Sequence, residues 1–385
     1  MPAQADPPVS FLPMDSALRP QPGTALCLSG GGYRAMLFHL GALWRLNEIG
    51  YLPKLDRISS VSGGSITAGV LGLKWNRLAF DSSGIATQFV SEVVAPLRAL
   101  ADTTLDVKDF LAAIFLPGSI ADHVASSYRT YLFGDATLQD LPDKPRFVIN
   151  ATSVQSGALW RFSKPFMADW RVGLIRNPRL SLAVAVSASS AFPPVLSPAH
   201  LDLTKFGFEP GSGADLQVKP YIDHAILTDG GVYDTLGLET AWKQYLTVLV
   251  SDGGGYTAPD AEPHADWARH ALRVNDLIDN QVRHLRQRQL IDSFESNERA
   301  GTYWALRSDI RRYPAAGALP CPFDATQELA AIPTRLAKLK ATIQEQLINW
   351  GYAICDAGMR AHVAPALPPP AAFPYPASAV SGRMA

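Results

Sequence analysis

The sequence predicts an α/β protein in three layers, with helices on both faces of a central, mostly parallel sheet. Two short apolar stretches, TALCLS at residues 24–29 and DRISSVS at residues 56–62, each lead into a glycine-rich turn and then into an apolar helical pattern. This repeated order of strand, tight turn and helix is typical of parallel strands joined by crossover helices. With 47% hydrophobic and 18% charged residues, the 385-residue chain can fill a large core.

The predicted elements follow from the spacing of apolar residues. The first helix places Met36, Leu40 and Leu43 on one face and ends before Gly50, a favourable residue for a helix C-terminus. The second helix begins near Ser65, which we expect to cap it. In chain order we predict strand 24–29, helix 33–49, strand 56–62, a helix from residue 65, helices and loops over 85–140, strands 147–154 and 246–255, and helices 265–297 and 334–360.

One domain, over residues 24–362, accounts for these elements. It includes a helical insert at about 85–140 and a helical C-terminal part at about 263–362. Residues 1–23 are rich in proline and predict an extended arm. Residues 363–385 are rich in proline and alanine, so we expect a disordered tail.

Charge, cysteine content and hydropathy exclude several classes of function. A net charge of −1 gives no basic field that would attract nucleic acid. The three cysteines have no CxxC spacing, which indicates small core residues and not a zinc ribbon or a disulfide framework. No apolar run reaches the roughly 18 residues of a transmembrane helix, and the N-terminus has no signal-peptide pattern. We therefore expect a cytoplasmic protein that also contacts membranes peripherally, while export as an effector stays open.

The turn after the second predicted strand has the pattern of a nucleophile elbow. In SSVSGGS the G-x-S-x-G pattern places Ser62 as the nucleophile, with Gly63 and Gly64 after it and Ser60 where the first glycine is usual. Such a turn raises the serine hydroxyl above the sheet edge and sets a helix N-terminus beneath it, where negative charge is favoured. Taken alone, the stretch also fits a plain loop in which a serine caps the helix.

A serine nucleophile needs a base, and the best candidate is an aspartate. The eight histidines lie early in the chain or in helical and polar stretches without turn residues around them. In ILTDGGVYDTLG an apolar run ends at Asp229, and two glycines leave its carboxylate unobstructed. Closing the site to water would raise the pKa of Asp229 from its reference of about 3.9 and make it a better base. The same tripeptide recurs at Asp252, but we prefer Asp229 because a helix carrying Asp234 follows it.

Taken together, these motifs resemble the patatin-like phospholipase family and its relatives, the cytosolic group IV phospholipases. The resemblance rests on the glycine-rich stretch SGGGYRAM at 29–36, the serine elbow, the small-residue segment SASSAFPPV at 187–195 and the later DGG, in that order. It spans about residues 24–255, and Ser60 in the place of glycine departs from the pattern. It implies a patatin-like catalytic domain with a Ser-Asp dyad and no histidine.

The resemblance also implies an activity, that of a serine ester hydrolase of the phospholipase A or lysophospholipase type. Ser62 would form an acyl-enzyme, Asp229 would move the protons, and the backbone N–H groups of Gly30, Gly31 and Gly32 would hold the oxyanion. The implied substrate is a phospholipid or another lipid ester at a membrane or micelle surface. No cofactor, metal or nucleic acid is implied, and the need for a protein activator stays open.

Three further features each allow two interpretations. Arg34 either anchors a lipid phosphate or makes structural hydrogen bonds at the start of its helix. The apolar stretch at 105–120 is either a lid or interfacial contact, or else a buried helix, which such runs more often form. The predicted helix at 265–297 has either a solvated basic face or a contact with an anionic membrane, and its interspersed aspartates favour the first.

Two other functions stay as alternatives. Gly30, Gly32 and Ala35 fit the GxGxxA turn of dinucleotide-binding enzymes, which also opens a helix after a strand. The acidic residue that should follow about 20 positions later is missing. The second alternative is an inactive member of the same fold, against which the presence of both dyad residues argues.

Overall fold

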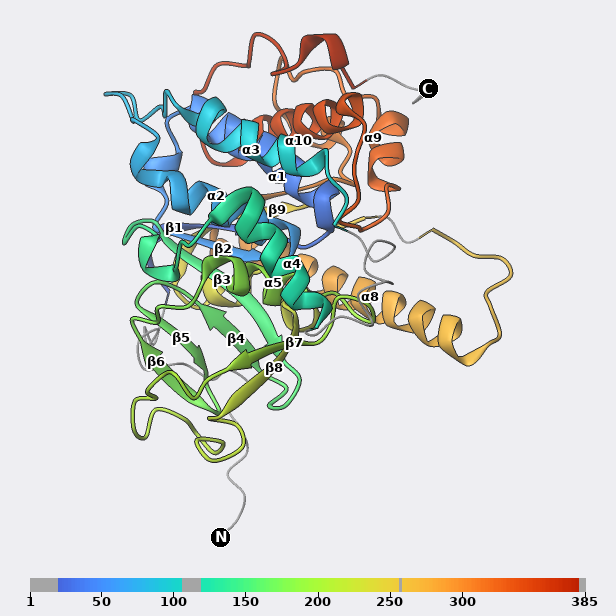
Figure 1. Cartoon of the computed structure of the whole chain (residues 1–385). Coiled ribbons are helices and arrows are strands. Elements are labelled where there is room, and N and C mark those ends of the chain that lie inside the picture. The colour runs from blue at the N-terminus through green and yellow to red at the C-terminus, as the bar shows by residue number, and fades with distance from the viewer. Residues whose placement is uncertain (1–19, 106–118, 256–257, 381–385) are drawn as a thin grey trace.

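The computed structural model describes residues 20–105, 119–255 and 258–380, which form a sheet flanked by helices (Figure 1). The strands are β1 (Gln21–Leu28), β2 (Arg57–Val61), β3 (Arg146–Ser153), β4 (Leu159–Phe162), β5 (Phe166–Asp169), β6 (Gly173–Arg176), β7 (Ala199–Asp202), β8 (His224–Asp229), β9 (Tyr245–Asp252) and β10 (Ala300–Ala305). The helices are α1 (Gly32–Glu48), α2 (Gly63–Lys74), α3 (Ala95–Ala101), α4 (Ile120–Tyr128), α5 (Leu182–Ser189), α6 (Gly231–Asp234), α7 (Glu239–Trp242), α8 (Trp267–Glu295), α9 (Phe323–Ala330) and α10 (Ala341–His362).

The sheet has a parallel half and an antiparallel half. Its main path runs β10-β9-β1-β2-β3-β4-β5-β6, and neighbouring strands are parallel from β10 to β3. Strands β4 to β6 form an antiparallel meander, and β7 and β8 form a separate antiparallel pair. The predicted α/β class with a central, mostly parallel sheet is therefore confirmed.

Strand β3 brings the ends of β2 and β8 together. Along one edge of β3, Val61 at the end of β2 pairs with Asn150, and Asp229 at the end of β8 pairs with the next residue, Ala151. Strand β4 occupies the opposite edge, where Trp160 also pairs with Ala151. Since β2 and β8 share one edge end to end, the turns that follow these two strands meet.

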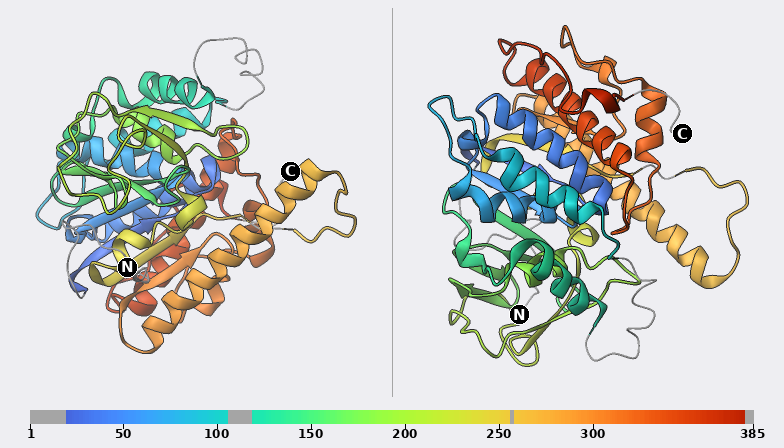
Figure 2. Two further views of the ribbon diagram at one scale, coloured as in Figure 1. Left: turned by 90° about the horizontal axis from the view of Figure 1, so that it is seen from below. Right: turned by 45° about the horizontal axis from the view of Figure 1, so that its top comes forward.

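Helices cover both faces of the sheet. Helices α1 and α10 lie side by side over one face, and α8 lies on the other side, as the two views of Figure 2 show. Alternate residues of β1 point to the two faces, so Leu26 and Leu28 enter one core cluster while Ala25 and Cys27 enter the other. The glycine loop at the start of α1 and the elbow at the start of α2 thus rest on a fully buried frame.

Several elements differ from the predictions. The predicted strands and helices around both glycine turns, β3, β9 and α8 are present within a few residues. Helix α10 begins at Ala341 and not near residue 334, and β4 to β8 and β10 were not predicted. The expectation that Ser65 caps α2 is wrong, because Ser62 occupies the N-cap position. The hydroxyl of Ser65 instead donates to Ser60 Oγ at 3.0 Å and lies 2.9 Å from Ser189 Oγ.

The C-terminal segment up to residue 380 is packed against the body, which differs from the expected disorder. Phe373 and Val380 are 9% and 3% exposed and belong to the main core. The side-chain amide of Asn349 on α10 donates to the carbonyls of Tyr375 and Ser378 and accepts the N–H of Tyr375. Apolar anchors between the prolines, together with this amide, order a segment whose composition alone suggested disorder. The predicted N-terminal arm as far as residue 19, and residues 106–118 of the predicted lid, lie outside the described residues.

Candidate active site

Ser62 lies in a sharp turn between β2 and α2. Its φ of 52° and ψ of −121° are rare for a residue with a side chain and hold strain of about 1–3 kcal/mol. A Cβ added to Gly63 would lie 2.2 Å from the carbonyl oxygen of Gly32, and one added to Gly64 would lie 2.4 Å from that of Leu28. Only glycine fits these two positions, so the turn has the tight backbone that a nucleophile elbow requires.

A network of serine hydroxyls holds the elbow. The N–H of Ser62 donates to Ser189 Oγ at 3.0 Å, and Ser189 Oγ donates to the carbonyl of Asn150 at 2.6 Å. Ser60, in the place of the usual glycine, is fully buried, and its hydroxyl accepts the 3.0 Å hydrogen bond from Ser65. The structure therefore accommodates the serine that departs from the sequence pattern.

Asp229 ends β8 beside this turn and is 3% exposed. Its backbone N–H donates to the carbonyl of Ala191 at 2.9 Å, and its carbonyl accepts from Thr152 Oγ1 at 2.8 Å. In the side chain, Oδ1 accepts from the N–H of Gly231 at 2.7 Å, while Oδ2 has no hydrogen-bond partner in the described part of the chain. One carboxylate oxygen is thus fixed and the other is available.

Burial raises the pKa of Asp229 to about 7, chiefly because the carboxylate loses its contact with water. The N–H of Gly231 and the hydroxyl of Ser62 lower this pKa in part, and the charge of Asp279 raises it further. The Ser62 hydroxyl is near enough to the carboxylate to lower its pKa. Oδ2 nevertheless accepts no hydrogen bond of normal geometry within the described residues. Catalytic hydrogen bonds are often loose before substrate binds.

Ser189 joins the two turns. It is the last residue of α5, and besides accepting the N–H of Ser62 through Oγ, it accepts the N–H of Gly230 through its carbonyl at 3.3 Å. The sequence singled out the segment that contains Ser189 but not the residue itself. Only the fold reveals that one side chain and its own carbonyl connect the serine turn to the aspartate turn.

The glycine loop after β1 faces the nucleophile. A Cβ added to Gly30 would lie 3.2 Å from Ser62 Cβ and 3.8 Å from Ser62 Oγ. The N–H of Gly30 donates to the carbonyl of Thr235 at 3.3 Å and is therefore engaged. The N–H groups of Gly31 and Gly32 have no acceptor among the described residues. Of the three predicted donors, two are free to bind an oxyanion, and the third fixes the loop.

A family model described as patatin-like phospholipase matches residues 26–242, which is more than half of the chain. The chain belongs to this family. The structure of human GIVD cytosolic phospholipase A2 is similar, with a TM-score of 0.52 and 13% identity over 86% of this chain. This chain covers 58% of that protein. VipD from Legionella pneumophila aligns over 87% of this chain and 66% of its own, with 15% identity and a TM-score of 0.35. Curated proteins contain no match.

In this patatin-like protein, Arg34 serves the structure of the loop. It is 2% exposed, and burial lowers its pKa to about 9. Nε donates to the carbonyl of Gly253 at 3.3 Å, Nη2 to Thr334 Oγ1 at 2.9 Å, and Nη1 to the carbonyl of Ile332. Since all three nitrogens are committed to the protein, the structure favours the structural role of Arg34 over that of a lipid-phosphate anchor.

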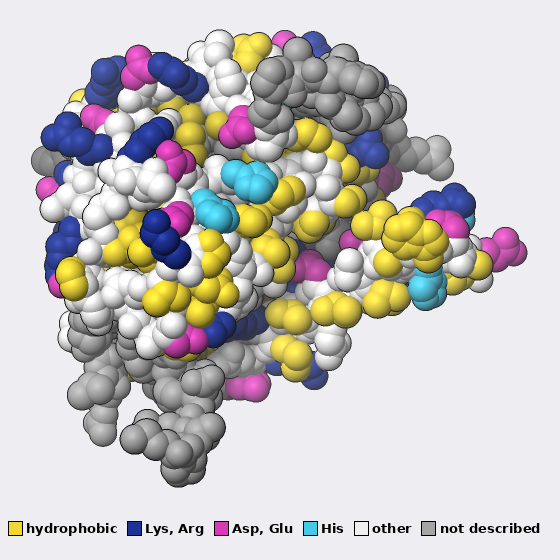
Figure 3. Space-filling model, turned by 60° about the horizontal axis from the view of Figure 1, so that its bottom comes forward, with side chains coloured by type: hydrophobic (Ala, Val, Ile, Leu, Met, Phe, Trp, Pro, Cys, Tyr) yellow, Lys and Arg dark blue, Asp and Glu magenta, His cyan; other side chains and the backbone are white. Residues whose placement is uncertain are grey.

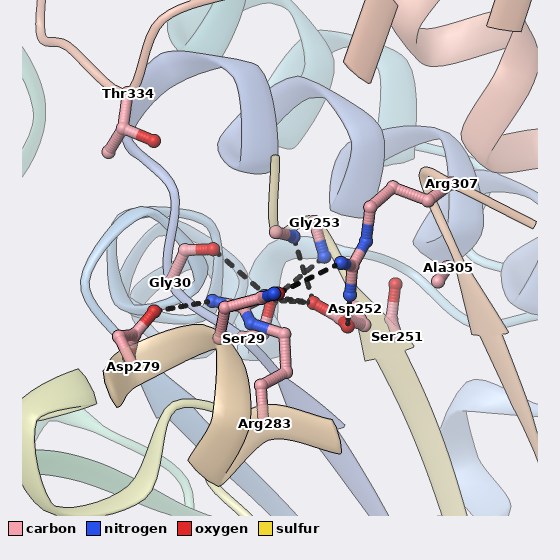
Figure 4. Close-up of polar contacts among 12 residues, drawn as sticks. Ser29, Gly30, Ser251, Asp252, Gly253, Asp279, Arg283, Ala305, Arg307 and Thr334 are labelled. Atoms are coloured by element: carbon pink, nitrogen blue, oxygen red, sulfur yellow. Dashed lines mark hydrogen bonds and ion pairs between the residues drawn. The ribbon is translucent and has the colours of Figure 1, made fainter. Parts of the chain in front are cut away.

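The second Asp-Gly-Gly turn of the patatin-like chain lies behind the glycine loop (Figure 4). Asp252 Oδ1 accepts from Arg283 Nη1 at 2.6 Å and from Ser29 Oγ at 3.2 Å, while Oδ2 accepts from the hydroxyl of Tyr303 at 2.8 Å. Burial alone would raise the pKa of Asp252, but Arg283 and Arg307 hold it well below its usual range. Asp252 is thus a permanently charged support for the loop.

Most histidines of the chain are exposed at the surface. Of the eight histidines only His39 is buried, where its ring lies 2.8 Å from Ser251 Oγ and 2.9 Å from the carbonyl oxygen of Ser29. Burial lowers the pKa of His39 to about 4, so it is neutral. Among the described residues, no cluster of histidine, cysteine and acidic side chains could hold a metal ion.

None of the described helices combines the length and apolar character of a membrane span.

Proposed function

We propose that the chain hydrolyses carboxylic esters of lipids, as a phospholipase A or lysophospholipase, through a dyad of Ser62 and Asp229. One observation carries the proposal. A strained serine and a buried aspartate with a raised pKa and a free oxygen occupy adjoining positions where β2 and β8 meet on β3. The match to the patatin-like phospholipase model supports lipid esters as the substrate class.

In the first half of the reaction, Ser62 Oγ attacks the ester carbonyl carbon while Asp229 Oδ2 accepts the hydroxyl proton. The carbonyl oxygen becomes an oxyanion, which the free N–H groups of Gly31 and Gly32 stabilise. Each such donor is typically worth about 3 kcal/mol of barrier. When the intermediate collapses, the bond to the leaving alcohol breaks, Asp229 returns its proton to that alcohol, and the acyl chain stays on Ser62.

In the second half, water replaces the alcohol. Asp229 accepts a proton from water as its oxygen attacks the acyl carbon, and the same N–H groups hold the second oxyanion. Collapse releases the fatty acid, and the proton returns from Asp229 to Ser62 Oγ. A base with a pKa near 7 suits this task at neutral pH, because it is partly ionised yet strong enough to accept the proton.

The alternative of dinucleotide binding has no support from the site. The loop that fits the GxGxxA pattern faces Ser62, as the short distances from Gly30 to that side chain indicate. The bound anion would therefore be the transient oxyanion of an ester attached to Ser62. We propose that the substrate comes from a membrane or micelle surface, with no cofactor.

The experiment that tests this function is hydrolysis of p-nitrophenyl butyrate by purified Ser62→Ala protein. We expect activity to fall by at least about 10³-fold while the circular dichroism spectrum is unchanged, because the nucleophile is lost. Ser187→Ala is the matched control: like Ser62, Ser187 is a buried serine, but it lies on α5 and donates to the carbonyl of Ala121. Full activity in Ser62→Ala would refute the proposal.

A further inference from the structure

Helix α8 projects from the body (Figure 1) and exposes apolar side chains (Figure 3). Trp267 is 85% exposed, Ile278 is 56% exposed and Leu285 is 51% exposed. With Val274, which is 38% exposed, they are spaced by seven, four and seven residues and so share one face of the helix. Figure 3 shows hydrophobic side chains along this projecting helix. A continuous exposed apolar surface of this kind indicates contact with a membrane or with another protein.

Acidic side chains on the projecting half of α8 lie away from the apolar stripe. By helical spacing, Asp276 and Asp279 lie on the side away from the apolar stripe, and Asp279 pairs with the buried Arg283 at 3.6 Å. Arg288 lies one turn beyond Leu285, is exposed, and has no ion pair among the described residues. From Trp267 to Leu285 the stripe therefore carries no charged residue, and beyond Leu285 it is followed by the exposed Arg288 and then by the exposed Asp292.

The fixed half of α8 is bound to the second Asp-Gly-Gly turn and to α7. Arg283 binds Asp252 at 2.6 Å, and Arg286 binds Glu239 of α7 at 3.1 Å. The charge of Asp279 reaches Asp229. The apolar stripe thus extends from this bound half of α8 along the projecting half.

The rim around the aspartate is also apolar. Phe192 follows Ala191, whose carbonyl fixes the N–H of Asp229, and is 47% exposed. Val232, three residues after Asp229, is 57% exposed. Two exposed apolar side chains are thus close in sequence to the groups that hold Asp229.

We propose that the apolar stripe of α8 docks on an anionic phospholipid surface and so presents lipid esters to the Ser62 site. This inference rests on the proposed function for the identity of the substrate. An interfacial helix buries an apolar face in the outer acyl region and places its cations among lipid phosphates, with tryptophan favoured at the boundary. Trp267, Ile278 and Leu285 provide that face, and Arg288 provides the cation.

The test is sedimentation of full-length Ser62→Ala protein with vesicles of phosphatidylcholine and phosphatidylglycerol, in which binding is measured without turnover. The double variant Ile278→Ser, Leu285→Ser should lower the partition coefficient on the order of tenfold, because two half-exposed apolar side chains no longer enter the lipid. Val90→Ser is the matched control, since Val90 is 50% exposed at the start of a π-helical turn (Val90–Val94). Arg288→Glu should weaken binding only to vesicles that contain phosphatidylglycerol.

Equal binding by the double variant and the Val90→Ser control would overturn the docking surface. The proposal would also be overturned if the protein self-associates, does not bind vesicles, and becomes monomeric in the double variant. In that case a second copy of the chain would cover the stripe. Failure of the proposed function is separate: it would appear as absent hydrolysis of soluble p-nitrophenyl butyrate by the wild type, whatever the vesicles bind.

Discussion

The chain contains two Asp-Gly-Gly turns with the same three residues and opposite electrostatics. Asp229 is buried without a paired cation among the described residues, and burial raises its pKa to about 7. Asp252 is equally buried, but Arg283 and Arg307 hold its pKa well below the usual range. The first is poised to exchange a proton at neutral pH, whereas the second is a fixed charge.

The Asp-Gly-Gly tripeptide therefore supplies only a tight turn after a strand. What decides its role is the set of side chains that other elements bring to the carboxylate. Arg283 comes from α8 and Arg307 from the loop after β10, 31 and 55 residues along the chain from Asp252. At Asp229 the neighbouring elements contribute Ser62 and backbone N–H groups instead.

The largest expected effect on stability comes from neutralising the fixed charge. Asp252→Asn leaves the buried Arg283 and its neighbour Arg307 without their shared carboxylate, so the free energy of unfolding should fall by about 3–5 kcal/mol in urea denaturation. Asp135→Asn is the control, since its ion pair with Arg129 is exposed and should contribute little. If Asp252→Asn were as stable as the wild type, the inferred difference in electrostatic role between Asp252 and Asp229 would be contradicted.

Neutralising Asp229, in the other turn, should raise the free energy of unfolding and not lower it. Because the folded state raises the pKa of Asp229, ionising it costs stability as pH rises from the usual range through about 7. Asp229→Asn removes that cost and should stabilise the protein by about 4 kcal/mol at pH 8, with little change at pH 4. Melting temperatures of both proteins at the two pH values check this; equal destabilisation at both would contradict it.

The smallest expected effect concerns the link between the elbow and the first turn. Ser189→Ala removes the acceptor of the Ser62 N–H, so kcat should fall about tenfold while KM changes little, as expected for the loss of one positioning hydrogen bond. Ser189→Thr, which keeps the hydroxyl, should recover part of kcat. A change in stability alone, with wild-type kcat, would reduce Ser189 to a packing role.

The sequence predicts the elements around the site well because their signals are local. A short apolar run followed by glycines places β1, α1, β2 and α2, and an elbow pattern points to Ser62. The strands β4, β5 and β6 are missed because each has only four residues, and they become strands through pairing with distant partners. Their stability is not encoded in their own composition.

Individual roles within the site were less predictable. Arg34 allowed two roles in sequence, and its acceptors at Ile332 and Thr334 lie about 300 residues away. Gly30 looked equivalent to its two neighbours until its N–H was seen to bind Thr235. Asp252 looked like an ordinary turn because nothing nearby in sequence signals its arginine partners. In each case the deciding contact is long-range.

Activation of Ser62 by Asp229 without histidine can be tested by the rate of fluorophosphonate labelling as a function of pH. We expect a single label on Ser62, a rate that rises with a midpoint near pH 7, and no labelling of Asp229→Asn. Labelling of Ser62 in Asp229→Asn at the wild-type rate, or a label on another serine, would contradict it.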